Sequence, residues 1–362
     1  MMLIRLLPLL ASLSLAHASP EPVTFTAFGS RVYDMIIERP AAPEGAAQRN
    51  ALVVLLGGGV ANDMDWTTPA EYSMTGEAYA DAPALSEMLT GMGFTVARYS
   101  TIHHDDPFKD QWPTRATPYT YPQSLDLAHA AVRAAREAAG DAGARVILLG
   151  HSLGARRAIQ IALHESGVAG VVALSPADLV DTGMKGEEGR TLRADAGRVL
   201  ADIDISGNDR VEPYELQAWA ARPEDFARFP HDEDAFEALD IDRSGHIHRW
   251  ELMAHLLHTK RLTQPLPTEM RKDRYGLPVP EDALATGKIS ALLLFGGIDT
   301  WGFQKPLLQD RLRETVQHDV TITILPGLGH NLSEQKEQRA GSVDARALEE
   351  VRVWFEARFA GK

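Results

Sequence analysis

Residues 145–154 read RVILLGHSLG, and this stretch decides the fold. Its first half is a short apolar run, typical of a parallel strand that is covered on both faces. Gly150 and Gly154 then frame Ser152 in the spacing G-x-S-x-G, and a helical pattern follows over residues 156–164. A serine at the tip of a tight strand-to-helix turn has strained backbone angles, and its neighbours leave room only for glycine. The stretch therefore predicts a serine hydroxyl raised above the end of a buried strand.

The alternation of short β-branched runs with helical patterns continues on both sides of this turn. Such alternation indicates βαβ units and a mainly parallel sheet, so we expect an α/β fold. The expected strands are residues 23–28, 32–37, 51–56, 94–99, 145–149, 168–174, 289–295 and 320–325, and the expected helices are residues 125–139, 156–164 and 343–359.

The character of the chain changes between residues 175 and 288. Residues 181–256 contain 18 acidic and 9 basic residues, a net charge of −9 out of −14 for the whole chain. Buried-strand patterns stop there, and short amphipathic helices replace them. We therefore expect a core in two parts, residues 19–180 and 285–362, with an all-α domain inserted as a cap at residues 181–284.

Composition excludes several classes of function. Of the 362 residues, 44% are hydrophobic and 24% charged, which is ordinary for a soluble globular protein. The chain has 36 basic and 50 acidic residues, and a net charge of −14 repels phosphate backbones, so we expect no nucleic-acid partner. Because there is no cysteine, disulfides, thiolate metal sites and a cysteine nucleophile are excluded.

The first eighteen residues, MMLIRLLPLLASLSLAHA, have the three parts of a secretory signal peptide. Arg5 precedes an apolar run, and Ala16 and Ala18 occupy the positions of an A-x-A cleavage site. The run is too short to span a bilayer as a mature helix. We expect a mature chain that begins near Ser19, has no membrane span, and is periplasmic or secreted.

A serine hydroxyl becomes a nucleophile only when a base takes its proton. His330 follows the last predicted strand, and Asp299 follows the strand before it. Catalytic groups in such sheets collect at the carboxyl ends of strands, so we expect both residues to lie near Ser152. Asp178, which follows the strand at residues 168–174, is a second candidate for the acid. Asp299 is favoured because its strand directly precedes that of His330.

An oxyanion formed at Ser152 needs two hydrogen-bond donors. The backbone N–H of Leu153, directly after the nucleophile, is expected to be one of them. The second is expected from Gly58 or Gly59 in the loop after the third strand, and the sequence leaves that choice open.

Together, the G-H-S-L-G turn, the acid, the histidine and the two oxyanion loops resemble the α/β-hydrolase superfamily, over roughly residues 23–180 and 285–360. The context is similar to its esterase, lipase and serine-aminopeptidase branches. Leu56 stands where many esterases and lipases carry a histidine before the glycines. The resemblance implies a serine hydrolase that cleaves a carboxylic ester, or an amide, through an acyl-enzyme.

Residues 240–251, DIDRSGHIHRWE, fit the twelve-residue EF-hand calcium loop. Gly245 stands at place 6, where the loop must turn sharply. Calcium is a hard cation that takes oxygen ligands, and this spacing wraps them around one centre. The expected ligands are Asp240, Asp242, Ser244, Glu251 and the carbonyl oxygen of His246.

Another loop of this kind, the first of the two in the chain, begins 36 residues earlier, at residues 204–215, DISGNDRVEPYE. Asp209 takes the place of the glycine at place 6, and Asp can enter the left-handed region at some cost. The expected ligands are Asp204, Ser206, Asn208, the carbonyl oxygen of Arg210, Glu212 and Glu215. The insert therefore resembles a paired EF-hand module with two calcium sites, of which the site at residues 240–251 is the stronger.

Two hypotheses about function remain at this point. The first is an exported hydrolase whose cap is made rigid by calcium, with the metal outside the chemistry. The second is a catalytically inactive hydrolase fold that binds calcium and serves as an interaction module. One fold hosts many chemistries, so the resemblance does not identify the substrate.

Overall fold

The computed structural model describes residues 20–41, 50–59, 63–106, 119–140, 145–177, 179, 187–220, 233–262, 277–286, 289–299, 305, 308, 312, 319–336 and 339–359. The expected signal peptide at residues 1–18 and the alternative acid Asp178 lie outside these residues.

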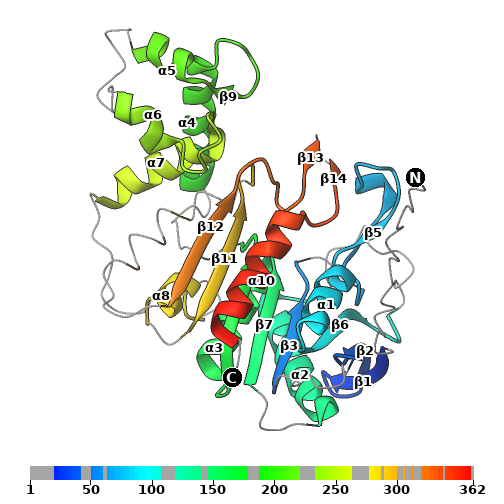
Figure 1. Ribbon diagram of the computed structural model, residues 1–362. Coiled ribbons are helices and arrows are strands. Elements are labelled where there is room, and N and C mark those ends of the chain that lie inside the picture. The colour runs from blue at the N-terminus through cyan, green and yellow to red at the C-terminus, as the bar shows by residue number, and fades with distance from the viewer. Residues whose placement is uncertain are drawn as a thin grey trace, which may run out of the picture.

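One large sheet forms the centre of the molecule (Figure 1). Its strands are β1 (Glu21–Ala27), β2 (Arg31–Glu38), β3 (Ala51–Leu56), β6 (Thr95–His103), β7 (Arg145–His151), β8 (Val168–Leu174), β11 (Ala291–Gly296) and β12 (Val320–Leu325). They lie in the order β1-β2-β6-β3-β7-β8-β11-β12. Strand β2 pairs antiparallel with β1 and β6, and all pairs from β6 to β12 are parallel. The prediction of a mainly parallel sheet is confirmed.

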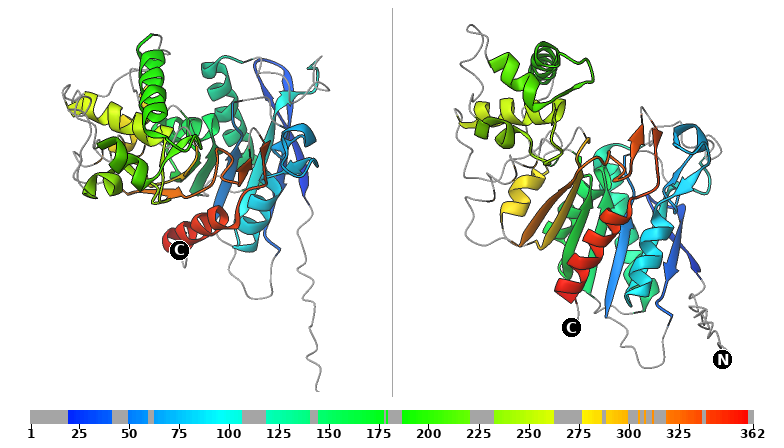
Figure 2. Two further views of the ribbon diagram at one scale, coloured as in Figure 1. Left: turned by 90° about the horizontal axis from the view of Figure 1, so that it is seen from above. Right: turned by 45° about the horizontal axis from the view of Figure 1, so that its top comes forward.

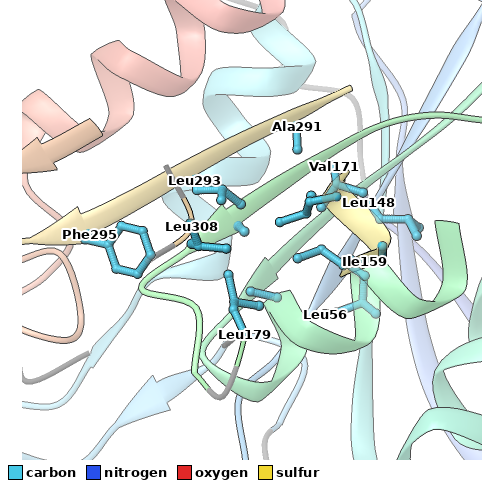
Figure 3. Packing of buried hydrophobic residues seen from close by; sticks show 14 of the residues in the cluster. Leu56, Leu148, Ile159, Val171, Leu179, Ala291, Leu293, Phe295 and Leu308 are labelled. Atoms are coloured by element: carbon cyan, nitrogen blue, oxygen red, sulfur yellow. The ribbon is translucent and has the colours of Figure 1, made fainter. Parts of the chain in front are cut away.

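Helices cover both faces of this sheet (Figure 2). One face packs against α1 (Ala82–Gly91) and α10 (Ala345–Phe359), and the other against α2 (Tyr121–Ala139), α3 (Leu153–His164) and α8 (Pro280–Ala285). Every residue of β3 is buried, because its side chains alternate between these two apolar layers. Figure 3 shows part of the layer on the α3 side, where Leu56, Ile159 and Leu293 are buried together. Two-sided burial explains why the strands read as continuous apolar runs.

Two short hairpins lie at the carboxyl end of the sheet (Figure 1). One pairs β4 (Thr67–Thr68) with β5 (Tyr79–Ala80) around the 3₁₀ helix η1 (Ala70–Tyr72), and the other pairs β13 (Gln335–Lys336) with β14 (Arg339–Ala340).

No helix among the described residues is both long enough and apolar enough to cross a membrane.

Helices and two very short strands make up the middle of the chain, beyond the carboxyl ends of β11 and β12 (Figures 1 and 2). The elements are α4 (Glu187–Ile203), β9 (Arg210–Val211), α5 (Pro213–Ala220), α6 (Glu233–Leu239), β10 (Ile247–His248) and α7 (Arg249–Leu262). Strands β9 and β10 pair antiparallel, with Val211 opposite Ile247. Both of these side chains are fully buried, so the two helix–loop–helix units are joined through an apolar contact between their loops.

Most predicted elements lie within a few residues of the observed ones. The main differences are that neither α1 nor α8 is among the expected helices, that β6 continues to His103, because β2 pairs with it that far, and that α2 begins at Tyr121 and α3 at Leu153. Helix α3 begins earlier than its apolar spacing predicts, because the turn at Ser152 leads directly into its first residue.

Close packing between β8 and α10 gives a test of this arrangement. A Cβ added at Gly170 would lie 2.8 Å from the ring of Trp354, which is buried. We expect Gly170→Ala to lower the free energy of unfolding by about 1–3 kcal/mol, measured from the urea midpoint. Gly91→Ala is the matched control, because no atom lies within 4 Å of its added Cβ, and it should be neutral or stabilising by up to about 1 kcal/mol. Equal midpoints for the two variants would contradict the packing described here.

Candidate active site

The turn between β7 and α3 holds Ser152 in a strained backbone conformation. Its φ is 54° and its ψ is −121°, a region that non-glycine residues seldom adopt. A Cβ added at Gly154 would overlap the carbonyl oxygen of Leu56, and one added at Gly150 would overlap the backbone of Gly154. The Ser152 N–H donates a hydrogen bond to the carbonyl of Leu174 at 2.9 Å. The two glycines are therefore required by backbone contact, as the G-x-S-x-G spacing predicts.

The ring of His330 bridges Ser152 and Asp299. Its Nε2 lies 3.0 Å from Ser152 Oγ, and its Nδ1 lies 3.0 Å from Asp299 Oδ2. A neutral ring that carries its proton on Nδ1 satisfies both contacts, donating to the carboxylate and accepting from the hydroxyl. Asp299 is 2% exposed, whereas the His330 side chain is 34% exposed. The structure thus brings together the three side chains that the sequence placed at three strand ends.

The turns that carry Asp299 and His330 are packed directly against each other. A Cβ added at Gly296 would overlap the carbonyl oxygens of Leu328 and Gly329. The N–H of Ile298 donates to the carbonyl of Leu328 at 2.9 Å, and the N–H of Gly297 donates to the carbonyl of Leu325 at 2.7 Å. Backbone hydrogen bonds between the turns therefore fix the distance from the carboxylate to the imidazole.

His151 contributes to the site, although the sequence analysis did not single it out. Its Nε2–H donates to the carbonyl oxygen of His330 at 3.1 Å, and the two ring centroids are 5.2 Å apart. Burial lowers the pKa of His151 to about 4, and the nearby His330 ring acts in the same direction. A neutral imidazole thus holds the main chain of His330. The only signal in the sequence was its position directly before Ser152.

Arg157 fixes the candidate oxyanion loop, residues 57–59, through hydrogen bonds. It is a second residue that the sequence analysis missed. Its guanidinium donates to the carbonyl oxygens of Gly57 and Gly58, the latter at 2.7 Å. In a trans peptide the N–H points away from the C=O of the preceding residue. Because the carbonyls of Gly57 and Gly58 point to Arg157, the N–H groups of Gly58 and Gly59 point away from Arg157. Arg157 is 3% exposed, and the buried residues of α3 also include the polar side chains of Arg156 and Gln160.

The three expected oxyanion residues lie around the serine. A Cβ added at Gly58 would be 3.5 Å from Ser152 Cβ, and one added at Gly59 would be 2.7 Å from Leu153 Cδ1. Leu153 is the first residue of α3, where backbone N–H groups have no acceptor within the helix. Gly58 is therefore beside the nucleophile and Gly59 beside the helix N-terminus.

The loop at residues 240–251 gathers three carboxylates. One oxygen from each of Asp240, Asp242 and Glu251 lies within 4.8 Å of the others. Glu251 is fully buried and Asp242 is 4% exposed. Burial raises the pKa of Glu251 to about 9 and that of Asp242 to about 6, because carboxylates crowded away from water favour the neutral form. Among the described residues, Asp242 Oδ2 has no hydrogen-bond partner. A cation that takes oxygen ligands fits this cluster.

The remaining expected ligands of this loop lie around the same cluster. Ser244 Oγ is 3.0 Å from the carbonyl oxygen of His246, and the Ser244 N–H donates to Asp240 Oδ1 at 2.9 Å. Glu251 accepts from the N–H groups of Ile241 and His248, at 2.6 and 2.7 Å. The twelfth residue therefore closes the loop onto its beginning.

The loop at residues 204–215 has the same hydrogen-bond pattern. Asp204 accepts from the N–H groups of Asn208 and Asp209, at 3.1 and 2.7 Å, and Glu215 accepts from those of Ser206 and Glu212, at 2.8 and 2.9 Å. Left-handed φ values occur at the same places in both loops, at Gly207 and Asp209 here and at Arg243 and Gly245 in the other. Asp209 thus adopts, at a φ of 62°, the conformation for which Gly245 is suited.

Among the described residues, only the loop at residues 240–251, and not this first loop, brings three carboxylate oxygens within 4.8 Å of one another. Asn208 and Glu212, two of its expected ligands, contact each other at 3.3 Å, and both Asn208 and Ser206 are exposed. Arg210, whose carbonyl oxygen is an expected ligand, pairs with His248 across the short two-stranded sheet. The two loops are therefore linked through β9 and β10. They differ in how many carboxylates lie close together and in how far their expected ligands are buried.

Comparison with known proteins gives one family match. The model of a family described as "Alpha/beta hydrolase family" matches residues 53–341. No match to the sequence is found among curated proteins.

Several solved structures are similar at low identity. A dienelactone hydrolase from Anabaena variabilis is 12% identical with a TM-score of 0.47, over 94% of this chain and 98% of that one. An esterase from Pyrococcus furiosus is 12% identical with a TM-score of 0.48, over 95% and 94%. A thermostable carboxyl esterase from Bacillus coagulans is 14% identical with a TM-score of 0.47, over 94% and 99%. Likenesses at this level carry no information about substrate.

The partly buried His151 ring gives a pH-dependent prediction. Because its folded-state pKa is lowered to about 4, the folded protein binds this proton less readily than the unfolded chain. The stabilisation is complete above about pH 6.5, the ordinary value for histidine, and is lost as the pH falls toward 4. We expect the ring resonances of His151 to stay those of a neutral imidazole at pH 5, assigned by their loss in His151→Phe. The same variant should have a flatter curve of stability against pH between 6.5 and 4. Titration of His151 near pH 6.5 would contradict this prediction.

Proposed function

The chain belongs to the alpha/beta hydrolase family, and from that premise we propose that it is a serine hydrolase that cleaves a carboxylic ester, or an amide, through an acyl-enzyme. The observation that carries the proposal is the placement of the His330 ring at 3.0 Å from both Ser152 Oγ and Asp299 Oδ2. Such a chain of contacts gives the hydroxyl a base and gives the base an orienting carboxylate.

In the proposed reaction Ser152 Oγ attacks the substrate carbonyl carbon while His330 Nε2 accepts the hydroxyl proton. Asp299 keeps the Nδ1–H of His330 in place and stabilises the imidazolium that forms. The Leu153 N–H and the N–H of Gly58 or Gly59 hold the negative oxygen of the tetrahedral intermediate. His330 then returns the proton to the leaving group, and water releases the acyl group by the same steps. The exposure of the His330 ring is consistent with access for substrate and water.

We also propose that the insert, assigned to residues 181–284, is a paired EF-hand module that binds two calcium ions. The support is the cluster of buried carboxylates at residues 240–251, and the repeat of its hydrogen-bond pattern and left-handed residues at residues 204–215. The ligands are those expected from the sequence, with residues 240–251 as the stronger site because more buried carboxylates meet there. Calcium bound there would neutralise the repulsion among Asp240, Asp242 and Glu251.

Export belongs to the same proposal. The pattern of residues 1–18 supports cleavage near Ser19 and a periplasmic or secreted mature chain. Calcium is abundant outside cells, so even millimolar sites would be filled there.

Substitutions at the serine and the acid test the chemistry. We expect a fluorophosphonate probe to label Ser152 and a panel of chromogenic esters and aminoacyl anilides to be hydrolysed. Ser152→Ala should lose the label and lower kcat by about 10⁴-fold or more. Asp299→Asn should lower kcat on the order of 10⁴-fold, because the ring is no longer held in the required tautomer.

The control for these variants is Ser166→Ala, which replaces an exposed serine away from the turn and should label and hydrolyse like the wild type. A folded wild-type protein that is neither labelled nor active on any substrate of the panel would contradict the enzymatic proposal. That outcome would favour the calcium-binding interaction module instead.

Calcium titration tests the metal sites. Isothermal titration of the calcium-free protein should give two sites, and Glu251→Gln should abolish the tighter one, because a bidentate carboxylate is lost. At calcium a hundredfold above Kd, each site that is absent from the unfolded chain should add about 2.7 kcal/mol to stability, seen as a rise in Tm. Asp202→Asn, which removes an exposed acid of α4 outside both loops, should keep both sites. Unchanged titration of Glu251→Gln would exclude the assignment.

A further inference from the structure

The calcium loop at residues 240–251 touches the turn that carries Asp299. Trp250, at place 11 of the loop, donates its indole N–H to the carbonyl oxygen of Gly297 at 2.5 Å. Trp250 is 3% exposed, so this bond is shielded from water. Gly297 lies two residues before Asp299, in the short connection that leaves β11. The contact therefore joins the insert to the candidate active site through one buried hydrogen bond.

A second contact falls on the same glycine. A Cβ added at Gly297 would overlap Asp242 Oδ2, the buried carboxylate oxygen without a hydrogen-bond partner among the described residues. Asp242 is at place 3 of the loop, and Glu251, next to Trp250, is at place 12. Asp242, an expected calcium ligand, therefore touches Gly297 itself. Trp250, which also contacts Gly297, is next in the chain to a second expected ligand, Glu251. Movement of these ligands onto an ion would be transmitted directly to the glycine.

The turn has little freedom to absorb such a movement. On its other side, the N–H groups of Gly297 and Ile298 bond to the carbonyls of Leu325 and Leu328, in the segment that leads to His330. Asp299 N–H in turn bonds to the carbonyl of Gly296 at 3.1 Å. Residues 296–299 therefore lie between the calcium loop and the histidine turn, and their position sets the contact of Asp299 with His330.

We infer that Trp250 is a positioning residue, through which calcium at residues 240–251 holds the Asp299 turn in the geometry that orients His330. This inference rests on the proposed function and extends it, because it makes calcium a regulator of the hydrolase instead of a support for the cap alone. Trp250 does not contact substrate; it acts through Gly297. The second loop is the coupled one, since the residue at its place 11 is buried, whereas Tyr214, at the same place of the first loop, is 53% exposed.

Hydrogen exchange of the full mature chain tests this coupling without relying on activity. In the wild type, calcium should slow exchange of the amides at residues 240–251 and also of those at residues 296–299. In Trp250→Phe, which keeps an aromatic ring but loses the indole N–H, calcium should still protect residues 240–251, while the protection at residues 296–299 should be lost. Trp219→Phe, the same substitution at another buried tryptophan of the insert, should behave like the wild type. If calcium protects the loop of the wild type but leaves residues 296–299 unchanged, the inference is wrong.

Kinetics on an ester substrate supply a second readout. For the wild type, removal of calcium should lower kcat and the rate of fluorophosphonate labelling of Ser152 about tenfold, with little change in KM, because Asp299 acts in the transition state. Trp250→Phe should have this low kcat with or without calcium while its calcium affinity stays within about threefold of the wild type. Activity that is the same with and without calcium would overturn the inference and leave the proposed hydrolase intact. Absence of all hydrolysis and labelling would overturn the proposed function, and the exchange experiment would still decide the coupling.

Discussion

The two hydrogen bonds of the His330 ring require three turns, from strands far apart in the sequence, to pack within contact distance of one another. Strand β8 separates β7, which precedes Ser152, from β11, which precedes Asp299, so the ring has to reach across the sheet edge. Glycines make this approach feasible, because Gly154 and Gly296 touch carbonyl oxygens of neighbouring turns where any side chain would overlap. The strained backbone of Ser152 is held by the same packing, since its N–H is bonded to the next strand.

Around these turns lie polar side chains that the reaction would not use directly. Arg157 fixes the loop of Gly58 and Gly59 through their neighbouring carbonyls, and His151 fixes the main chain of His330. Each of these side chains donates a hydrogen bond to carbonyl oxygens that would otherwise be costly to remove from water. Preorganised donors of this kind are what an oxyanion site needs, because little reorganisation is then required during the reaction.

The acidic insert is placed where it can affect the site. It lies beyond the carboxyl ends of β11 and β12 (Figure 1). Its contact with the Asp299 turn is made by the loop at residues 240–251, through the side chain of Trp250. In the proposed calcium-binding module, oxygen ligands for the cation would account for the concentration of negative charge in this part of the chain. For the proposed calcium ion, a role in folding and a role in positioning the Asp299 carboxylate are compatible, since both would follow from neutralising Asp242 and Glu251.

The sequence alone determined the local features: the buried strands, the turn at Ser152, the ligand spacing of the two loops, and the candidates Asp299 and His330. These follow from short-range rules, because burial on both faces demands apolar runs, and tight turns demand glycine at fixed spacing. Only the tertiary structure decided which groups support them. Neither the position of Arg157 beside the glycine loop nor the contact of Trp250 with Gly297 leaves a pattern in the chain, because each joins residues about fifty to a hundred positions apart through one or two hydrogen bonds. Such contacts depend on how the elements pack, and no periodicity or spacing encodes them.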